Sequence, residues 1–443
     1  MNGPRRIIFV SYFFPPIGGA AAQRPLQFVR HLSRRGYEPV VITGPGNTGG
    51  RWTPGDASLA TSIPDDVDVR RVAGPEPSGS SRWRSRGERW LGRRSEWAKW
   101  WIEGVVDEAA RVEGDIALVY TVISPYETSE ACARIALARN VPWVPDLGDP
   151  WALDDMAVYP TALHRRLELR RMRRGLGTAT GIVMSTPDAE RRVRDTLRLD
   201  GARMWVVPNG FDQADFEADP PRRDPDDVVR VVHTGYLHAE LGRGQKAAAR
   251  AHGLLGGGSP GVEILTRSHV FLLEAVNNLL AKRPDVGRRI EVHLAGVTTQ
   301  TDEEIARACP AVRLHGYLPH AESVRLLETA DLLFLPMQKL VQGLRSGNVP
   351  GKTYEYLASG RPILAAVPEG DARDLLERAG ATYVCEPDDV AAMEEILAAR
   401  VRALDDGEPP PVRNREVVAE YEWGTLAARV ESALDSILAH RAS

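Results

Sequence analysis

The stretch from Gly347 to Tyr356 holds residues suited to binding a phosphate-bearing ligand. A loop rich in glycine, asparagine and proline runs directly into a helix, reading SGNVPGKTYEYL from Ser346. The free N–H groups at the start of a helix, together with the helix dipole, attract anions. Lys352 adds a positive charge there, and Glu355 can accept hydrogen bonds from vicinal hydroxyls such as those of a ribose. The alternative is an ordinary loop and helix with a solvated lysine and glutamate.

A second glycine-rich loop lies close to the N-terminus. Tyr12–Gly19 contains two proline and two glycine residues, which interrupt regular structure. Gly18 and Gly19 allow a ligand to approach the backbone, although a tight turn without a ligand also accounts for them. Because a βαβ crossover is right-handed, this loop is expected at the carboxyl edge of a sheet. The expected unit consists of a strand at Ile7–Ser11, a helix at Ala21–Arg34 and a strand at Pro39–Thr43.

The elements that must position these loops alternate between strand and helix in two series. Asp212–Val228 separates the series and is acidic, proline-rich and without periodicity, as is typical of an interdomain linker. This pattern predicts an α/β fold with two Rossmann-like, doubly wound domains that face a central ligand cleft. Further strands are predicted at Asp68–Val72, Ile116–Val122, Trp143–Asp146, Gly181–Ser185, Met204–Val207, Val229–Thr234, Ile290–Ala295, Val312–His315, Leu332–Leu335 and Pro362–Ala365.

The domain boundaries follow from the same alternation. Residues 1–211 are expected to form the first domain, 212–228 the linker and 229–415 the second domain, with a C-terminal helix in 416–443 that packs back toward the first domain. The alternation fails between His238 and Val262, where glycine is dense. We expect a mobile loop or an insertion there.

Composition and charge restrict the class of protein. The chain has 443 residues, of which 43% are hydrophobic and 26% charged, and its net charge of −4 argues against a protein that coats nucleic acid. Cys132, Cys309 and Cys385 are far apart and are expected to be buried free thiols. The N-terminus enters a strand without a signal peptide, and no apolar run approaches the ~20 residues that span a bilayer. We therefore expect a cytoplasmic protein.

The segment Arg82–Trp101 is basic and rich in tryptophan. Trp83, Trp90 and Trp97 recur every seven residues and would share one face of a helix. Such a helix can lie on anionic lipid at the inner membrane face or receive a lipid-linked acceptor. More often such a face packs on its own domain, so peripheral membrane contact through 82–101 is left open. The arginine-rich stretch His164–Arg174 carries a weaker signal of the same kind.

The loop and helix described first resemble a known family. The run PGKTYEYLASGRPILA from Pro350 is similar to the donor-binding segment of the retaining family-4 glycosyltransferases, which have the GT-B fold. Members commonly carry two glutamates separated by seven residues; Glu355 matches the second, and Gly347 stands in place of the first. That departure resembles the branch acting on amino sugars and deoxysugars in surface glycans and natural products. The similarity extends to the N-terminal PPxGG loop, Val206–Asp212 and Ala330–Pro336.

The resemblance implies a basic residue that binds the diphosphate of a nucleotide sugar. In the family this residue stands seven positions before a glutamate, and Arg267 stands seven before Glu274 here. Its bidentate guanidinium suits a diphosphate, although a surface cation is the alternative. The family usually has a second basic residue just after the glycine of the strand. Gly235 is followed by a tyrosine here, and Arg243 and Lys246 are the alternatives for this second basic residue.

The resemblance also implies contacts to the nucleotide base and to the acceptor. The backbone at Tyr317 and Leu318 is expected to meet the base. Asp146–Trp151, reading DLGDPW, resembles a D-x-x-D-x-W element on the acceptor side. We expect Asp149 to position the acceptor hydroxyl and Asp146 to cap a turn. The full donor-binding set expected is Gly18, Gly19, Gly235, Tyr317, Leu318, Asn348, Val349, Pro350, Gly351 and Glu355, with Arg267, Lys352 and Asp149 as catalytic residues.

The expected activity is transfer of a sugar from a nucleoside-diphosphate sugar to a hydroxyl group, with retention. Arg267, Lys352 and the 348–351 amides would stabilise charge on the departing diphosphate without a metal or other cofactor. UDP is favoured as the nucleotide; the sequence does not name the sugar, the acceptor or the oligomeric state. Two alternatives stay open: a nucleotide-sugar epimerase of the same architecture, and a catalytically silent partner subunit that binds nucleotide sugars. Acceptor-dependent release of nucleoside diphosphate separates them.

Overall fold

The chain folds into two compact units. The computed structural model describes residues 5–48, 54–77, 94–199, 202–216, 227–255 and 261–442. The first unit is built mainly from Met1–Asn209 and Trp423–Ser443, and the second from Gly210–Leu254 and Ser259–Glu422. The C-terminal segment therefore belongs with the N-terminal part of the chain.

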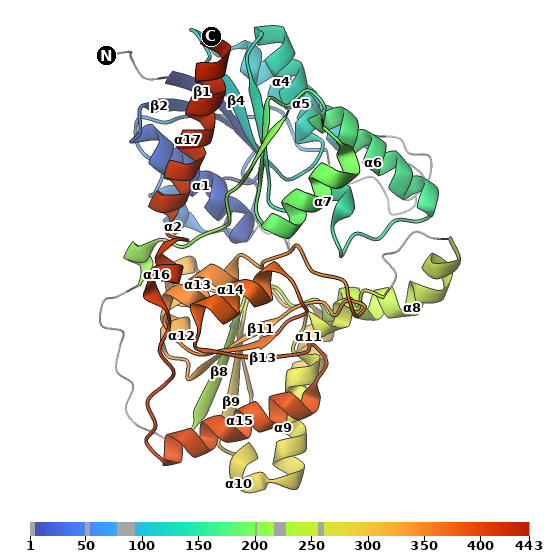
Figure 1. Ribbon diagram of the computed structural model, residues 1–443, viewed down its shortest axis with the longest axis vertical. Helices are drawn as coiled ribbons and strands as arrows, with labels where there is room; N and C mark the ends of the chain where they lie inside the picture. The colour runs from blue at the N-terminus through green and yellow to red at the C-terminus, as the bar shows by residue number, and fades with distance from the viewer. Residues whose placement is uncertain are drawn as a thin grey trace. The chain divides into compact units, whose positions relative to one another are not determined.

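The first unit contains a seven-stranded parallel sheet with the strand order β3-β2-β1-β4-β5-β6-β7 (Figure 1). The order reverses between β1 and β4, as in doubly wound folds. The strands are β1 Arg5–Ser11, β2 Tyr37–Thr43, β3 Asp68–Arg71, β4 Leu118–Ile123, β5 Trp143–Leu147, β6 Gly181–Met184 and β7 Arg203–Val206. The helices are α1 Ala20–Ser33, α2 Ala57–Ala60, α4 Glu96–Ala110, α5 Thr128–Arg139, η1 Trp151–Leu153, α6 Ala162–Leu176, α7 Pro187–Leu197 and α17 Trp423–Ala442.

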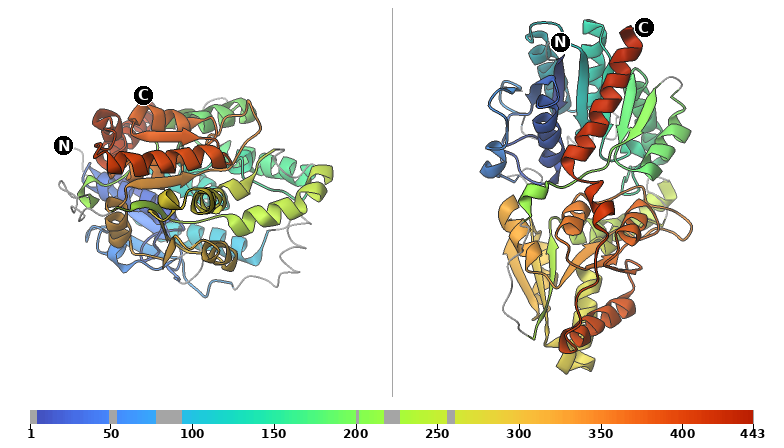
Figure 2. Two further views of the ribbon diagram at one scale, coloured as in Figure 1. Left: turned by 90° about the horizontal axis from the view of Figure 1, so that it is seen from below. Right: turned by 60° about the vertical axis from the view of Figure 1, so that its left-hand side comes forward.

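Alternating side chains of β1 supply two cores, one on each face of this sheet. Ile7 and Phe9 face α1 and α17, whereas Ile8 and Val10 face α4, α5, α6 and α7. Because both faces are covered, the strands are almost continuously apolar, which is the pattern that made them recognisable. The last helix, α17, lies beside α1 (Figures 1 and 2) and completes the core that contains Phe28 and Trp423.

The second unit contains a six-stranded parallel sheet with the order β10-β9-β8-β11-β12-β13. The order reverses between β8 and β11. The strands are β8 Val229–Thr234, β9 Ile290–Ala295, β10 Val312–Gly316, β11 Leu332–Pro336, β12 Ile363–Ala366 and β13 Thr382–Cys385. The helices are η2 Gln213–Asp215, α8 Ala239–Leu255, η3 Ile264–Thr266, α9 Val270–Lys282, α10 Pro284–Gly287, α11 Gln300–Arg307, α12 His320–Glu328, α13 Lys352–Ala358, α14 Asp371–Ala379, α15 Val390–Asp405 and α16 Arg415–Ala419.

Helices cover both faces of the second sheet as well. Val231 on β8 faces the core formed with α9, α11 and α15, whereas Val232 faces the core formed with α12, α13, α14 and α16. The prediction of two Rossmann-like, doubly wound domains is thus confirmed. Each predicted strand is present, with ends that differ by at most two residues. The short edge strand β13 was not predicted, because its four residues, three half-buried and one buried, give too short a pattern.

The expected loop between His238 and Val262 is wrong over most of its length, because Ala239–Leu255 is the helix α8. The helix is stabilised by tertiary contacts, which helix propensity cannot predict. Gln245 donates to the Val262 carbonyl at 2.8 Å and accepts from the Ile264 amide at 3.0 Å. Gly242 is required for close packing, since a Cβ there would lie 2.4 Å from the Cα of Leu265. Gly256–Gly258 lie outside the described residues.

The tryptophan-rich segment is described only from Arg94 onward, so Trp83 and Trp90 lie outside the described residues. Trp97, Trp100 and Trp101 belong to α4 and pack against the core of the first unit. The Nε1–H of Trp97 donates to Glu76 at 2.7 Å, and that of Trp100 to the Ala73 carbonyl at 3.2 Å. In its described part, this face therefore packs on its own domain. Within the described ranges, no helix is both long and apolar enough to cross a membrane.

The three cysteines are free and buried, as their spacing predicted. Burial raises the pKa of the Cys132 and Cys385 thiols to about 12. These thiols therefore behave as small apolar core side chains and not as nucleophiles.

Candidate functional site

The site in the second unit lies where the strand order reverses, at the carboxyl ends of β8 and β11. Doubly wound sheets bind their ligands at such a switch point. Gly235 follows β8 with a φ of +99°, and a Cβ on it would lie 2.9 Å from the Nζ atom of Lys352. The positive φ favours glycine at this turn, and any larger side chain would displace the Lys352 amine. The fold thus brings together Gly235 and Lys352, which were predicted as site residues from separate parts of the sequence.

Lys352, the first residue of α13, is held by a buried histidine. Its Nζ atom lies 3.0 Å from Nε2 of His233, and Nδ1 of His233 lies 2.9 Å from the Phe334 carbonyl oxygen. Burial, followed by the charge of Lys352, holds the pKa of His233 well below its usual range, so the ring is neutral. Its proton must sit on Nδ1 to reach the carbonyl, which leaves Nε2 to accept from Lys352.

The pKa of Lys352 lies near neutral pH, so only part of the molecules carry the charged amine there. Burial and then the positive charge of Arg267 lower the pKa of Lys352 to about 7, and Glu355 opposes that shift. Two cations that repel each other at a sheet edge form a site that an anion would stabilise. Lysines with such lowered pKa values occur often at functional sites.

Arg267 lies between η3 and α9, and not on the helix itself. Its Nη1 atom lies 3.3 Å from Oε1 of the buried Gln338, which follows β11. The Nε2 of Gln338 in turn lies 3.3 Å from the Oγ of Ser346. Gln338 therefore links the arginine to the start of the glycine-rich loop.

The loop before α13 has fewer open amides than we expected. The Asn348 N–H lies 3.3 Å from the Ser346 Oγ, and Pro350 has no N–H. The loop is fixed by backbone bonds from Ser346 to Glu369 at 2.8 Å and from Asp371 to Ser346 at 3.0 Å. Of the predicted donor-binding loop residues, Val349 and Pro350 are buried, and Asn348 and Gly351 are half-buried. Of the amides at 348–351, the one at Asn348 therefore faces the Ser346 hydroxyl, and Pro350 offers none.

Glu355 lies one turn into α13, and His320 is one of the ionisable residues that face it. Nδ1 of His320, the first residue of α12, lies 3.7 Å from Oε1 of Glu355. Nε2 of the same ring lies 2.8 Å from Oδ2 of Asp215. Burial raises the pKa of Glu355, and the charge of His320 lowers it. The adjacent Tyr356 accepts a hydrogen bond from the Thr234 amide at 2.9 Å, which joins α13 to the end of β8.

Tyr317 and Leu318 directly follow β10, which is an edge strand separated from β8 by β9. Both side chains are half-buried, and Gly316 before them has a φ of +69°. Their predicted contact to a nucleotide base stays a prediction. Arg243 and Lys246 lie on α8, where Lys246 pairs with Glu263 at 2.5 Å.

In the first unit, Gly18 and Gly19 form the turn between β1 and α1. The Gly18 N–H donates to the Pro54 carbonyl at 2.7 Å, and Gly19 precedes the helix with a φ of +82°. Asp149 is exposed and follows the carboxyl end of β5. Burial, followed by the charge of Asp149, raises the pKa of Tyr126. Tyr126 stacks on Trp151 with ring centroids 4.8 Å apart.

Asp146 does not cap a turn, and that expectation is wrong. Its carboxylate is fully buried and receives bonds from Arg24, with Nη2 at 2.8 Å and Nε at 2.9 Å. The hydroxyl of Tyr120 donates to it at 2.6 Å. Arg24 also donates to the carbonyl oxygens of Val207 and Pro208, each at 2.8 Å. Asp146 therefore anchors α1 to the end of the first unit's sheet.

Sequence reasoning missed His233, His320, Gln338 and Asp215. His233 carried a usable signal, because it is an ionisable residue at the carboxyl end of an otherwise apolar strand. The other three lie on separate elements, and only the fold brings them to the predicted Arg267 and Glu355. Their contacts could not be read from spacing.

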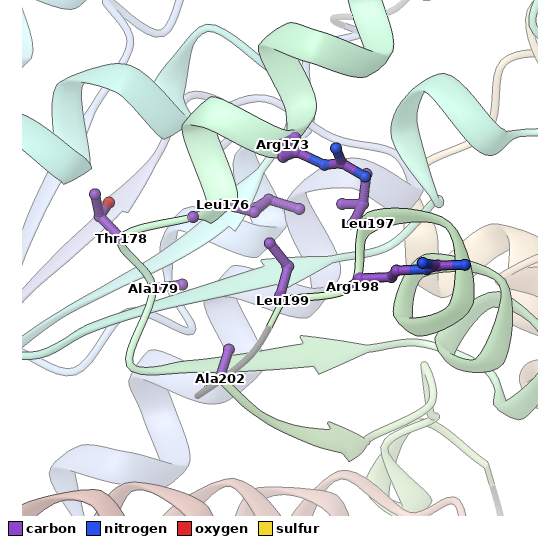
Figure 3. Close-up of a pocket in the computed structure, with 9 residues that line it drawn as sticks. Arg173, Leu176, Thr178, Ala179, Leu197, Arg198, Leu199 and Ala202 are labelled. Atoms are coloured by element: carbon purple, nitrogen blue, oxygen red, sulfur yellow. The ribbon is translucent and has the colours of Figure 1, made fainter.

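A surface hollow in the first unit lies elsewhere (Figure 3). It is formed by the C-terminal ends of α6 and α7 and by the residues just before β6 and β7, and its lining includes Arg173, Leu176, Ala179, Leu197, Leu199 and Ala202. This is the amino edge of the sheet, opposite the edge where open α/β sheets bind ligands. Across the described segments, no group of three or more His, Cys, Asp or Glu side chains is placed to hold a metal ion.

Comparison with known families identifies the class of protein. A model described as "Glycosyl transferase 4-like domain" matches residues 19–210, and one described as "Glycosyl transferases group 1" matches residues 264–403. Together the two matches span more than half of the chain. The chain therefore belongs to the GT-B-fold glycosyltransferases of the family-4 kind. No curated protein matches it.

Solved structures share this fold over nearly the whole chain at low sequence identity. Sucrose-phosphate synthase from Thermosynechococcus elongatus has a TM-score of 0.65 and 14% identity, covering 98% of this chain and 100% of that one. HepE of Anabaena in complex with UDP and glucose has a TM-score of 0.56 and 14% identity, with the same coverage. A putative UDP-N-acetylglucosamine 2-epimerase from Listeria monocytogenes has a TM-score of 0.56 and 14% identity, covering 98% and 96%. Fold alone thus accommodates both transferases and an epimerase.

Proposed function

We propose that the protein transfers a glycosyl group from a nucleoside-diphosphate sugar to a hydroxyl acceptor, with retention and without a metal. The observation that carries the proposal is the pair of cations, Lys352 and Arg267, at the switch point of the second sheet. UDP is the favoured nucleotide, because HepE, which shares the fold, binds UDP and glucose. Gly347 stands in place of the family's first glutamate, a departure that resembles the branch acting on amino sugars and deoxysugars.

In the proposed reaction, the bond between the anomeric carbon and the diphosphate oxygen breaks and a bond to the acceptor oxygen forms. The acceptor's proton passes to the leaving phosphate. Lys352 and Arg267 stabilise the charge that grows on the diphosphate, which is the largest electrostatic contribution available to such a site. Glu355 accepts hydrogen bonds from the ribose, and Asp149 positions the acceptor hydroxyl in the first unit.

Acceptor-dependent release of nucleoside diphosphate tests the proposal. The protein is incubated with a panel of nucleotide sugars, with and without hydroxyl-bearing acceptors, and the released diphosphate and the sugar are both followed. We expect release to rise at least tenfold with a fitting acceptor. An altered nucleotide sugar without release would indicate an epimerase. Binding of nucleotide sugars without either reaction, across the whole panel, would indicate a silent partner subunit.

The pKa of Lys352 predicts how nucleotide affinity depends on pH. In the free protein this pKa is about 7, and a bound diphosphate raises it. Below pH 7 the amine is charged in both states, so the affinity for UDP changes little until the phosphate itself titrates near pH ~6. Above pH 7 binding takes up a proton, and the affinity falls by up to about tenfold per pH unit. Calorimetry in two buffers of different ionisation enthalpy measures the proton uptake.

Variants of Lys352 and of its neighbour Glu355 test whether Lys352 causes this pH dependence. The ionisable groups that face it are His233, Arg267 and Glu355. Lys352→Arg stays charged throughout and should remove the proton uptake. Glu355→Gln should retain it. Equal proton uptake in the Lys352→Arg variant would contradict the assignment.

A further inference from the structure

The proposed reaction uses Glu355 but not the two ionisable residues, Asp215 and His320, that lie in line with it. Asp215 lies in η2, His320 begins α12 and Glu355 lies on α13. His320 contacts both carboxylates, with 2.8 Å from Nε2 to Asp215 and 3.7 Å from Nδ1 to Glu355. All three belong to the second unit. His320, held by Asp215, is therefore placed to fix the orientation of the Glu355 carboxylate.

The Asp215 carboxylate is itself held in place by the fold. Phe216, next to Asp215, is buried in the core of the second unit together with Phe211, and their rings make an edge contact with centroids 6.2 Å apart. The Asp212 side chain accepts from the Ala214 amide at 3.1 Å and caps η2. Asp215 is therefore presented to His320 by packed and capped backbone.

The electrostatic role of His320 follows from its position. Burial raises the pKa of Glu355, and Asp215 raises it further, whereas the charges of His320 and Lys352 lower it. Without the histidine, Glu355 would face a second carboxylate at a partly desolvated position. A protonated glutamate offers a donor where two ribose hydroxyls need acceptors.

We propose that His320, held by Asp215, orients the Glu355 carboxylate as the acceptor for the ribose hydroxyls of the nucleotide. This inference rests on the proposed function, because it assigns a positioning residue to the nucleotide end of the same site. It makes His320 a determinant of ribose recognition, and it leaves the diphosphate contacts of Lys352 and Arg267 unchanged.

The test compares the binding of UDP with that of 2′,3′-dideoxyuridine diphosphate, which lacks both ribose hydroxyls. We expect wild-type protein to prefer UDP by about tenfold or more, since hydrogen bonds to a charged group are the strong ones. His320→Leu should reduce this preference to about twofold, while the affinity for the dideoxy probe stays within about twofold. The unchanged dideoxy affinity shows that the variant is folded and that only ribose recognition is lost.

Two further variants complete the test. In His320→Asn the amide nitrogen overlies Nδ1, so a donor toward Glu355 remains and the preference should be partly restored. His440→Gln, an exposed histidine on α17, is the matched control and should keep the full preference. If Glu355→Gln loses the preference but His320→Leu keeps it, the inference is overturned and the proposed function stands. If wild type does not bind UDP, or Glu355→Gln keeps the preference, the proposed nucleotide site itself fails.

Discussion

Replacement of Lys352 by methionine is expected to lower kcat/KM for glycosyl transfer by about 10²–10³-fold, the effect of removing one preorganised group that stabilises developing charge. The loss should appear in kcat as well as in KM, because the charge on the diphosphate grows as the glycosyl bond breaks. Methionine keeps the unbranched apolar stem of lysine and lacks only its terminal amine; it loses the contact to His233 but relieves the repulsion between Lys352 and Arg267. The variant should therefore fold. Steady-state kinetics with the best donor and acceptor measure the effect.

Lys282 provides the matched control for this substitution. It lies in the last turn of α9, is largely exposed and forms a 3.8 Å ion pair with Glu394. Lys282→Met should leave kcat/KM within about twofold, as exposed ion pairs contribute little. A Lys352→Met enzyme with wild-type turnover would remove Lys352 from the leaving-group site.

Substitution of Asp146 by asparagine is expected to destabilise the first unit by about 3 kcal/mol or more. The substitution keeps the size of the side chain but leaves the buried Arg24 guanidinium without its counter-charge, and breaking one partner of a buried ion pair costs on this order. Arg24 retains its bonds to the Val207 and Pro208 carbonyls and its position 4.7 Å from the Phe28 ring, so the loss is partial. Urea unfolding of purified protein, followed by tryptophan fluorescence, measures the change in free energy.

The exposed pair of Arg134 with Glu103, 2.7 Å apart, provides the control. Glu103→Gln should leave the free energy of unfolding close to that of the wild type, because solvent screens this pair. If Asp146→Asn is no more destabilising than Glu103→Gln, Asp146 does not anchor the fold, and a role at the ligand edge of the first unit becomes the better interpretation.

The strands of both sheets could be predicted because they are buried on both faces. The predicted strands Val229–Thr234 and Ile290–Ala295, whose buried positions are mostly apolar, coincide with the observed strands to the residue. The helix α8 could not be predicted, since Gly242 and Gly253 lower helix propensity and the contacts of Gln245 that fix it are tertiary. β13 is too short for its alternation to stand out.

Individual side chains of the site were predicted less completely than the strands. Local sequence placed Lys352 and Glu355 at the start of a helix, and the structure has them there. Their partners come from distant parts of the chain: His233 lies 119 residues from Lys352, and Asp215 lies 105 residues from His320. Asp146 was predicted to cap a turn because a carboxylate at the end of a strand often does so. Its actual role depends on its buried partner, Arg24, which the local sequence does not reveal. Contacts of this kind depend on topology and not on spacing.

The most direct measurement of the donor site is a crystal structure of the protein with UDP bound. We expect the diphosphate within hydrogen-bonding distance of Lys352 Nζ and of the Arg267 guanidinium, at the carboxyl ends of β8 and β11. We also expect the ribose hydroxyls to bind the Glu355 carboxylate, with His320 still between Glu355 and Asp215. A diphosphate bound away from both Lys352 and Arg267 would contradict the central claim.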